Sequence, residues 1–259
     1  MDKYKTLLLY SDKKENLESG VNLMEPTDAL YDQASTIFSP DGRLYQVEYA
    51  REAINKGSTT LGLKYKDGVV LIAYKNYPSH LVEIQKMEKI FQIDDYIGCA
   101  FAGLSADAQR LVEIAQEEAQ VNKITYDENI TIKTLTDIIC EYKHAYTQYD
   151  GIRPFGVALI IAGIDQNGKR LYSTDPSGAF QEYKAICEGA GSVNVMNHLK
   201  NVYENDLTLD MAIDTGLKAL QKVNKKKINA DSLEIAVIDK KKKFYKLTNK
   251  EIKNIMRKS

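Results

Sequence analysis

The chain has 259 residues, 44% of them hydrophobic, so it is long enough to bury a full core as one large domain or two small ones. Its 35 Lys and Arg residues are balanced by 36 Asp and Glu residues, which excludes a global basic field for nucleic acid or an anionic membrane. Three cysteines set far apart in apolar surroundings are typical of buried thiols in a reducing compartment.

The first 30 residues are predicted to form a flexible tail. They mix charges with scattered apolar residues, lack a sustained period and contain breakers such as Gly20 and Pro26. The apolar run 7–10 is too short for a signal peptide core, and no later segment approaches the length of a membrane span. We therefore predict a cytoplasmic protein without membrane contact, with one folded domain over residues 31–259.

The periodicity then predicts helices and strands in a regular order. Apolar residues at three- and four-residue steps predict a helix over 43–55, and the Asp-Gly turn between two β-branched runs predicts a hairpin. The further elements follow in chain order: a strand pair at KIFQI and YIGCAFA, a helix from the N-cap Ser105 to about 122, a helix over 132–149, strands at GVALIIAGID, RLYSTD and EYKAIC, helices near 193–203 and 209–223, strands at LEIAVID and KFYKL, and a short helix from Asn249.

This order predicts an α+β fold. Strands come as antiparallel hairpins and helices come in pairs, which argues against alternating βαβ units. Two antiparallel sheets packed together, with a helix pair on each outer face, fit the order.

The run Gly57 to Thr60 raises the question of catalysis. A Gly followed by hydroxyl residues is where an autoprocessing hydrolase could expose an N-terminal nucleophile. The GAGS run at 189–192 lacks the lysine and further glycine of nucleotide loops, so a plain strand-to-helix turn is favoured. The three histidines lie far apart without ligand-type neighbours, so no metal or cofactor is expected: His80, His144 and His198.

Several motifs in order resemble those of an archaeal proteasome α subunit. The resemblance runs from YDQASTIFSPDGRLYQVEYAREA through GSTTLGLKYKDGVVLIA, MEKIFQIDD and RPFGVALIIAGID to TDPSGAFQEYKA, and covers nearly everything after residue 30. It implies the four-layer αββα sandwich of the N-terminal-nucleophile hydrolases. It also implies a noncatalytic subunit, because α subunits keep a helix ahead of the strand that in β subunits begins with the nucleophilic Thr.

The catalytic positions of the β kind can be compared residue by residue. By this resemblance Ser58 stands where the nucleophile would be, and Lys89 stands close to the catalytic lysine. The carboxylate and serine that support such a nucleophile are replaced by Tyr74 and Ala190. Lys226 and Asn229 stand near the positions where β subunits carry a further aspartate and serine. No catalytic residue is therefore expected.

The same resemblance implies a gate in the N-terminal region. The gate positions of the family correspond here to Tyr31, Asp32, Gln33, Pro40 and Tyr49. The Pro-Asp-Gly sequence is itself a reverse-turn signal. The family usually has Arg where this chain has Gln33, so an intersubunit ion pair with Asp32 loses its cation.

The implied partners are all proteins. Other α subunits would form a seven-membered ring, β subunits would stack on it, unfolded proteins would pass through it, and activating ATPases would insert C-terminal tails between neighbouring α subunits. The tail pocket corresponds to Lys89, Gly103 and Leu104, where the lysine would pair with the terminal carboxylate of the tail.

The sequence departs from the family pattern in two places, and two alternative functions are compatible with it. The tail of about 30 residues is longer than the usual short segment, and FAGLS at 101–105 replaces the usual TSGLV. The chain could instead be a β-like threonine peptidase cut near Gly57-Ser58, or a ring-forming α paralogue without a β partner.

Overall fold

The structure, a computed structural model, describes residues 36–76, 81–224 and 228–258. Its centre is a pair of five-stranded sheets in which every strand pair is antiparallel. The first sheet has the order β10 (Lys243–Lys246), β9 (Leu233–Asp239), β2 (Gly68–Tyr74), β1 (Thr60–Tyr65) and β8 (Ala185–Glu188). The second has the order β3 (Ile90–Asp94), β4 (Ile97–Gly103), β5 (Val157–Asp165), β6 (Gly168–Thr174) and β7 (Phe180–Glu182).

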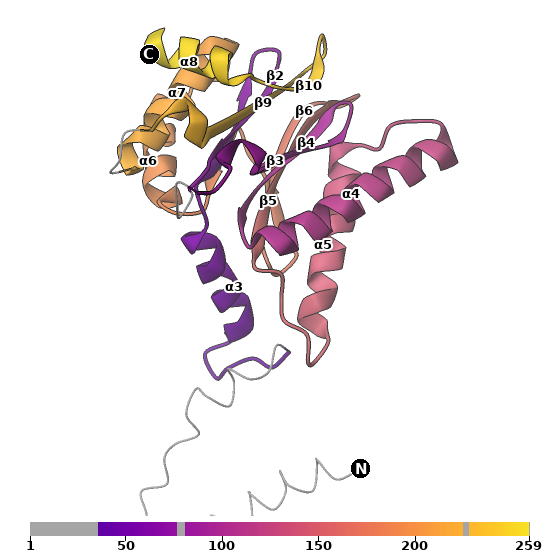
Figure 1. The fold of residues 1–259 in the computed structure, drawn as a ribbon. Coiled ribbons are helices and arrows are strands. Elements are labelled where there is room, and N and C mark those ends of the chain that lie inside the picture. Colours follow the sequence, from indigo (N-terminus) through magenta and orange to yellow (C-terminus); the bar gives the residue numbers. More distant parts are fainter. Residues whose placement is uncertain (1–35, 77–80, 225–227, 259) are drawn as a thin grey trace, which may run out of the picture. The chain divides into compact units, whose positions relative to one another are not determined.

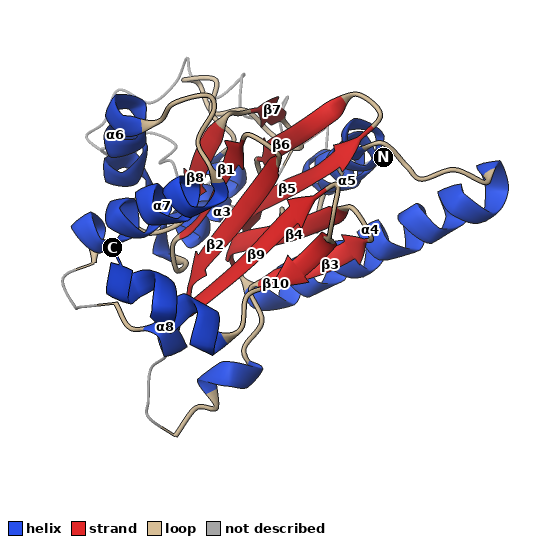
Figure 2. Cartoon of the chain, turned by 90° about the horizontal axis from the view of Figure 1, so that it is seen from above, coloured by secondary structure: helices blue, strands red, loops and turns tan. Residues whose placement is uncertain are grey.

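Helices cover the outer face of each sheet (Figures 1 and 2). They are α4 (Ser105–Tyr126), α5 (Ile132–Gln148), α6 (Ser192–Val202), α7 (Leu209–Val223) and α8 (Asn249–Lys258). A further helix, α3 (Tyr45–Lys56), precedes the first strand. One apolar cluster joins the second sheet to α4 and α5, and another joins the first sheet to α6, α7 and α8. A third cluster fills the space between the sheets. The predicted four-layer αββα sandwich is confirmed.

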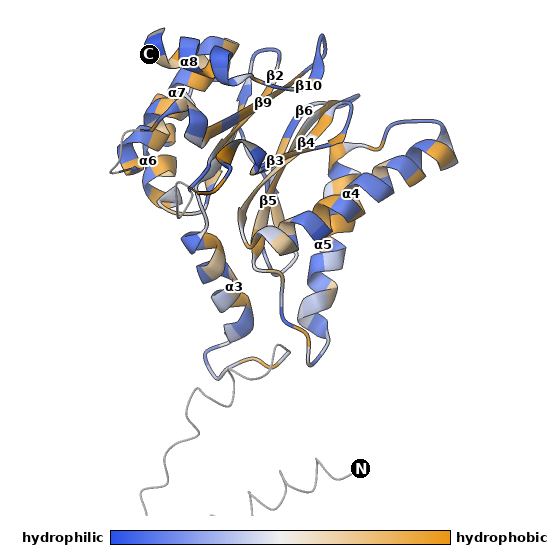
Figure 3. Cartoon of the chain, viewed as in Figure 1, coloured by the Kyte–Doolittle hydropathy of each residue, from blue (hydrophilic) through white to orange (hydrophobic). Residues whose placement is uncertain are grey.

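The layers explain the hydrophobic pattern of the strands. The eight residues at the start of β5 are all buried, and so are the first six of β2, because helices cover one face of each sheet and the other sheet covers the opposite face. The covering helices are apolar on one side only, and Figure 3 shows them banded accordingly.

Helix α3 stands apart from these layers and leads into the first strand. Its Ile54 packs with Ala102 and Ala158, so the helix lies against β4 and β5. The predicted turn precedes it: the Gly42 amide donates to the Ser39 carbonyl over 2.8 Å, and Gly42 has a φ of +75°. The sequence prediction of a helix over 43–55 is confirmed within two residues at its start and one at its end.

Three local expectations are changed or sharpened by the structure. The predicted strand EYKAIC is divided between the end of β7 and β8, which belong to different sheets. Ser105 is the first residue of α4 and not its N-cap, which is Leu104 without a side-chain hydrogen bond. The GAGS run is the predicted strand-to-helix turn, with Gly189 and Gly191 at φ +92° and +74°.

Within the described ranges, no helix is long and apolar enough to cross a membrane. The same part of the chain contains no group of three or more His, Cys, Asp or Glu residues that could hold a metal ion. All three cysteines are free and buried, as expected from the sequence: Cys99, Cys140 and Cys187.

Candidate functional site

The candidate site lies where α3 meets the first strand. Gly57 ends the helix and approaches the backbone of Gly103 so closely that a Cβ added to Gly57 would lie 2.4 Å from the Gly103 nitrogen. Gly103 itself has a φ of +113°. Neither position accepts a side chain without displacement of backbone, so this crossing fixes Ser58 at the start of the strand.

Lys89 reaches into this junction from the start of the second sheet. Its ammonium donates to Ser58 Oγ over 2.6 Å, lies 3.3 Å from the Ser58 carbonyl oxygen, and sits 4.5 Å above the centre of the Phe101 ring. The residue is only 5% exposed. A buried ammonium is thus held by a hydroxyl, a carbonyl and an aromatic face.

The electrostatics of Lys89 leave its charge incompletely balanced. Burial lowers the pKa of its ammonium to about 8, and the attraction of Glu234 opposes this only in part. The Glu234 carboxylate is engaged elsewhere: it accepts from the backbone nitrogen of Lys89 and pairs with the ammonium groups of Lys75 and Lys246 at 3.1 and 2.7 Å. An anion arriving at Lys89 would therefore meet a cation that is not yet paired with a carboxylate in the described part of the chain.

Residues at the former catalytic positions have structural contacts. The backbone nitrogen of Tyr74 donates to the Thr59 carbonyl, and the backbone of Ala190 bonds to Gly57 and to the Thr59 hydroxyl. Asn229 caps the short helix η3 (Ala230–Ser232) through reciprocal bonds with Ser232. Lys226 lies outside the described residues. The Ser58 and Lys89 side chains do meet, but no carboxylate of the described residues forms an ion pair with this lysine.

The three residues expected to form the tail pocket lie around one junction. Ser58 bonds to Lys89, and its neighbour Gly57 touches Gly103. Leu104 follows with its amide bonded to the Gly156 carbonyl and its side chain 45% exposed. Lys89 is buried, while Leu104 beside it is exposed.

The expected gate residues are only partly within the described chain. Tyr31, Asp32 and Gln33 lie outside the described residues. Pro40 is exposed in the turn ahead of α3, and Tyr49 is 48% exposed on the helix, with its ring stacked on that of Tyr45. The gate assignment stays a prediction.

Two ion pairs near this site are not anticipated by the sequence analysis. Arg51 of α3 makes a two-point contact with Asp175, and Arg153 makes one with Asp107 in the first turn of α4. Asp107 also accepts from the Gly156 nitrogen over 2.8 Å. For the contact between Arg153 and Asp107, the sequence offers only the Arg-Pro pair ahead of the VALIIAGID strand as a signal. That pair does not identify Asp107 as the partner.

The sandwich, with a helix ahead of the first strand and a buried lysine beside the start of that strand, defines the class of N-terminal-nucleophile hydrolase folds. Comparison with known families is more specific. The family model described as "Proteasome subunit" matches residues 54–238, and the model of the N-terminal signature of A-type proteasome subunits matches residues 31–53. The chain belongs to the proteasome subunit family, and within it to the noncatalytic α type.

Similar proteins are described as proteasome α subunits, and each comes from an archaeon. The one from Methanosarcina mazei is 52% identical over 225 residues, which cover 86% of this chain and 90% of the relative. Those of Methanothermobacter thermautotrophicus and Methanocaldococcus jannaschii are each 49% identical, over 89% and 91% of this chain and 94% and 90% of the relatives. These matches overturn the alternative of a β-like threonine peptidase cut near Gly57-Ser58.

Proposed function

We propose that this α subunit forms seven-membered outer rings that stack on β subunits and control the entry of unfolded proteins into a proteolytic chamber in the cytoplasm. Regulatory ATPases dock on these rings through their C-terminal tails. The proposal rests on the family, and one observation at the site carries its docking part: the ammonium of Lys89 is buried and forms no ion pair with a carboxylate of the described residues.

Lys89 has the properties that a receptor for a terminal carboxylate requires. A carboxylate that reaches the ammonium gains a charge-assisted hydrogen bond in a desolvated place, worth about 1.5–3 kcal/mol. The close approach of Gly57 and Gly103 keeps side chains away from the backbone there. An incoming chain end therefore has backbone groups within reach, and the exposed Leu104 offers an apolar contact beside them.

The gating part of the proposal assigns the moving element to the segment that precedes α3. The turn at Pro40 is exposed and is joined to the helix by the ion pair between Arg43 and Glu48. The proposed gate residues Tyr31 and Asp32 precede this turn in the sequence. Because Gln33 replaces the usual Arg, we expect neither the open nor the closed state of the gate to be stabilised by an ion pair between this position and Asp32.

The experiment that tests the proposal is co-expression with a β subunit from the same organism. Native mass spectrometry should show α rings of seven or multiples of seven, and the complex should cleave a fluorogenic peptide while the α chain alone should not. A monodisperse α monomer under conditions in which related chains assemble would overturn the ring. Rings that never bind β subunits would support a ring-forming paralogue without a β partner.

The docking part is tested separately on the same complex. A peptide that ends in a hydrophobic residue, a tyrosine and a variable residue should stimulate peptide cleavage, and its C-terminally amidated form should not. Lys89→Met should abolish the response to the free acid while leaving the basal cleavage of a short peptide measurable. Equal stimulation by the two peptides would contradict the role of the ammonium.

A further inference from the structure

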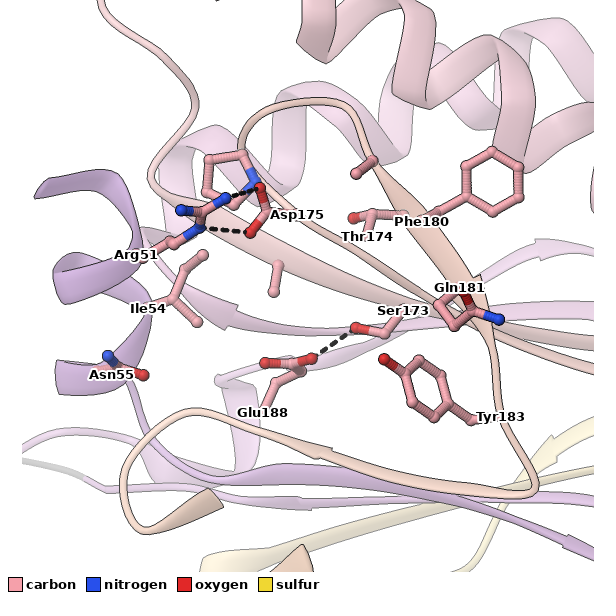
Figure 4. Close-up of a pocket in the computed structure, with 13 residues that line it drawn as sticks. Arg51, Ile54, Asn55, Ser173, Thr174, Asp175, Phe180, Gln181, Tyr183 and Glu188 are labelled. Carbon is pink, nitrogen blue, oxygen red and sulfur yellow. Dashed lines mark hydrogen bonds and ion pairs between the residues drawn. The ribbon is translucent and has the colours of Figure 1, made fainter. Parts of the chain in front are cut away.

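A cavity separate from the Lys89 junction lies at the edge of the sandwich, where the two sheets and α3 meet (Figure 4). Its volume is about 440 Å³, which falls within the range of small-molecule sites. Helix α3 contributes Arg51, Ile54 and Asn55 to one wall, while β6, β7 and the turn between them contribute residues 173–176 and 179–181. Glu188, the last residue of β8 in the first sheet, also lines the cavity, together with Ala158 and Tyr183.

Asp175, one of the two carboxylates in the cavity, is fully engaged. Its Oδ1 and Oδ2 accept from Arg51 over 3.0 and 2.8 Å. Oδ1 also accepts from the amide and hydroxyl of Ser177. Burial acts to raise the pKa of Asp175, but these donors outweigh it and hold the pKa below its usual value. The guanidinium of Arg51, the cation among the lining residues, is therefore already paired with the Asp175 carboxylate.

Glu188, the other carboxylate, has only a neutral donor. Ser173 Oγ donates to Glu188 Oε1 over 2.6 Å, across the gap between the two sheets. The described residues offer no hydrogen bond to the second oxygen. Figure 4 shows the carboxyl group between Ser173 and the side of the cavity on which Asn55 lies. Burial raises the pKa of Glu188, and the nearby charge of Asp175 adds to this. Keeping this half-buried carboxyl group ionised is unfavourable, and a cation beside it would favour the carboxylate.

The charged groups around Glu188 do not supply that cation directly. Lys143 of α5 is completely buried, and its ammonium donates to the Val157 carbonyl and to Thr174 Oγ1 over 2.9 and 3.0 Å. It attracts Glu188 at longer range but does not form an ion pair with it, and burial lowers its pKa to about 8. Two further ionisable groups interact with Glu188: burial and the charge of Glu188 raise the pKa of the Tyr183 phenol and that of the Cys187 thiol.

We propose that this cavity binds an alkylammonium or guanidinium group with Glu188 as its counter-ion. Such a group would donate to the free Glu188 oxygen, while the apolar part of the ligand would lie along Ile54 and Phe180. The shared chemistry has two sources: a free small amine, or a lysine or arginine side chain of a neighbouring copy. A metal ion is the weaker fit, since the described residues provide no cluster of three ligating side chains.

The test measures binding of 1,5-diaminopentane and agmatine to the assembled protein by calorimetry, with 1,5-pentanediol as the uncharged probe. Both amines should bind and the diol should not. Because the pKa of Glu188 is raised, the affinity should fall as the pH is lowered through that pKa and the carboxylate becomes protonated. Glu188→Gln should weaken binding about tenfold or more. The matched control Asp94→Asn removes a buried carboxylate outside this cavity and should bind as the wild type does.

A second variant keeps the proposal testable if Glu188→Gln does not fold. Ser173→Lys places an ammonium beside Glu188 and should abolish amine binding without loss of thermal stability. Binding to both the assembled and the dissociated chain indicates a free amine as ligand. Binding to the dissociated chain alone indicates that a side chain of a neighbouring copy fills the cavity. No amine binding in either state, or equal binding by wild type and Glu188→Gln, would overturn the proposal.

Discussion

Lys89 is the residue whose protonation sets the strength of the proposed tail docking. The pKa of its ammonium is lowered to about 8 in the free subunit, and only the protonated form attracts a carboxylate. Affinity for a tail peptide should therefore be nearly constant below pH 7 and should fall about tenfold between pH 7 and pH 9. Fluorescence polarisation of a labelled peptide across this range measures the effect.

The matched control for this pH dependence is Lys89→Arg, which keeps a cation that does not titrate in the same range. Its peptide affinity should be lower than that of the wild type, because the guanidinium fits the Ser58 hydroxyl less well, but independent of pH. A wild-type affinity that does not change up to pH 9 would show that the ammonium does not carry the docking.

Asp107 is the second residue with a testable charge. Burial acts to raise the pKa of its carboxyl, but hydrogen bonds from Arg153 and Gly156 outweigh it, so the pKa lies below its usual value. The interaction therefore stabilises the fold above the unfolded pKa and is lost as pH falls through the folded one. Asp107→Ala should lower the free energy of unfolding by about 2 kcal/mol, because the Gly156 amide also loses its acceptor.

Thermal unfolding at neutral pH measures this change, and a decrease in Tm of about 5 °C is expected. Glu113→Ala is the control on the same helix. Its carboxylate pairs with Arg110, both side chains are more than half exposed, and its loss should cost less than about 0.5 kcal/mol. If Tm decreased equally in Asp107→Ala and Glu113→Ala, the hydrogen bonds of Asp107 would not stabilise the fold more than an exposed ion pair does.

At the scale of elements, the sequence predicts the helices and strands whose apolar residues are regularly spaced. It does not predict features that depend on contacts between distant parts of the chain. The helices and most strands follow from apolar spacing. The division of EYKAIC does not, because β7 has only three residues and its partners lie on β6. Likewise, the sequence can place Ser58 at a strand start, but the contact with Lys89 joins residues 31 positions apart and depends on the crossing of two glycines.

Helix α3 is the element whose anchoring can be tested. Arg51 ties it to the turn after β6 through two hydrogen bonds to Asp175. Asp175→Asn removes the charge and one favourable acceptor, so amide hydrogen exchange in residues 45–56 should become about threefold faster or more. Glu52→Gln, on the same helix and exposed, should leave the exchange unchanged. Unchanged exchange in Asp175→Asn would mean that Ile54 and its apolar contacts anchor the helix alone.

At the scale of the whole molecule, the exposed end of α4 indicates how the chain meets other subunits. Figure 2 shows this helix extending well beyond the sheets. Near its C-terminal end Val121 and Ile124 share a face, since they lie three positions apart, and they are 51% and 84% exposed. Apolar side chains gathered on a protruding helix are typical of an interface.

Ile124→Glu should therefore impair assembly with other subunits, because a buried isoleucine at an interface contributes about 1.5–3 kcal/mol and a buried glutamate opposes it. Native mass spectrometry of the co-expressed α and β subunits would show smaller species in place of complete particles. Val193→Glu is the matched control, because Val193 is 71% exposed on α6 without a comparable protrusion. If Ile124→Glu assembles as completely as Val193→Glu, the end of α4 faces solvent in the particle, and the subunit contacts must use other surfaces.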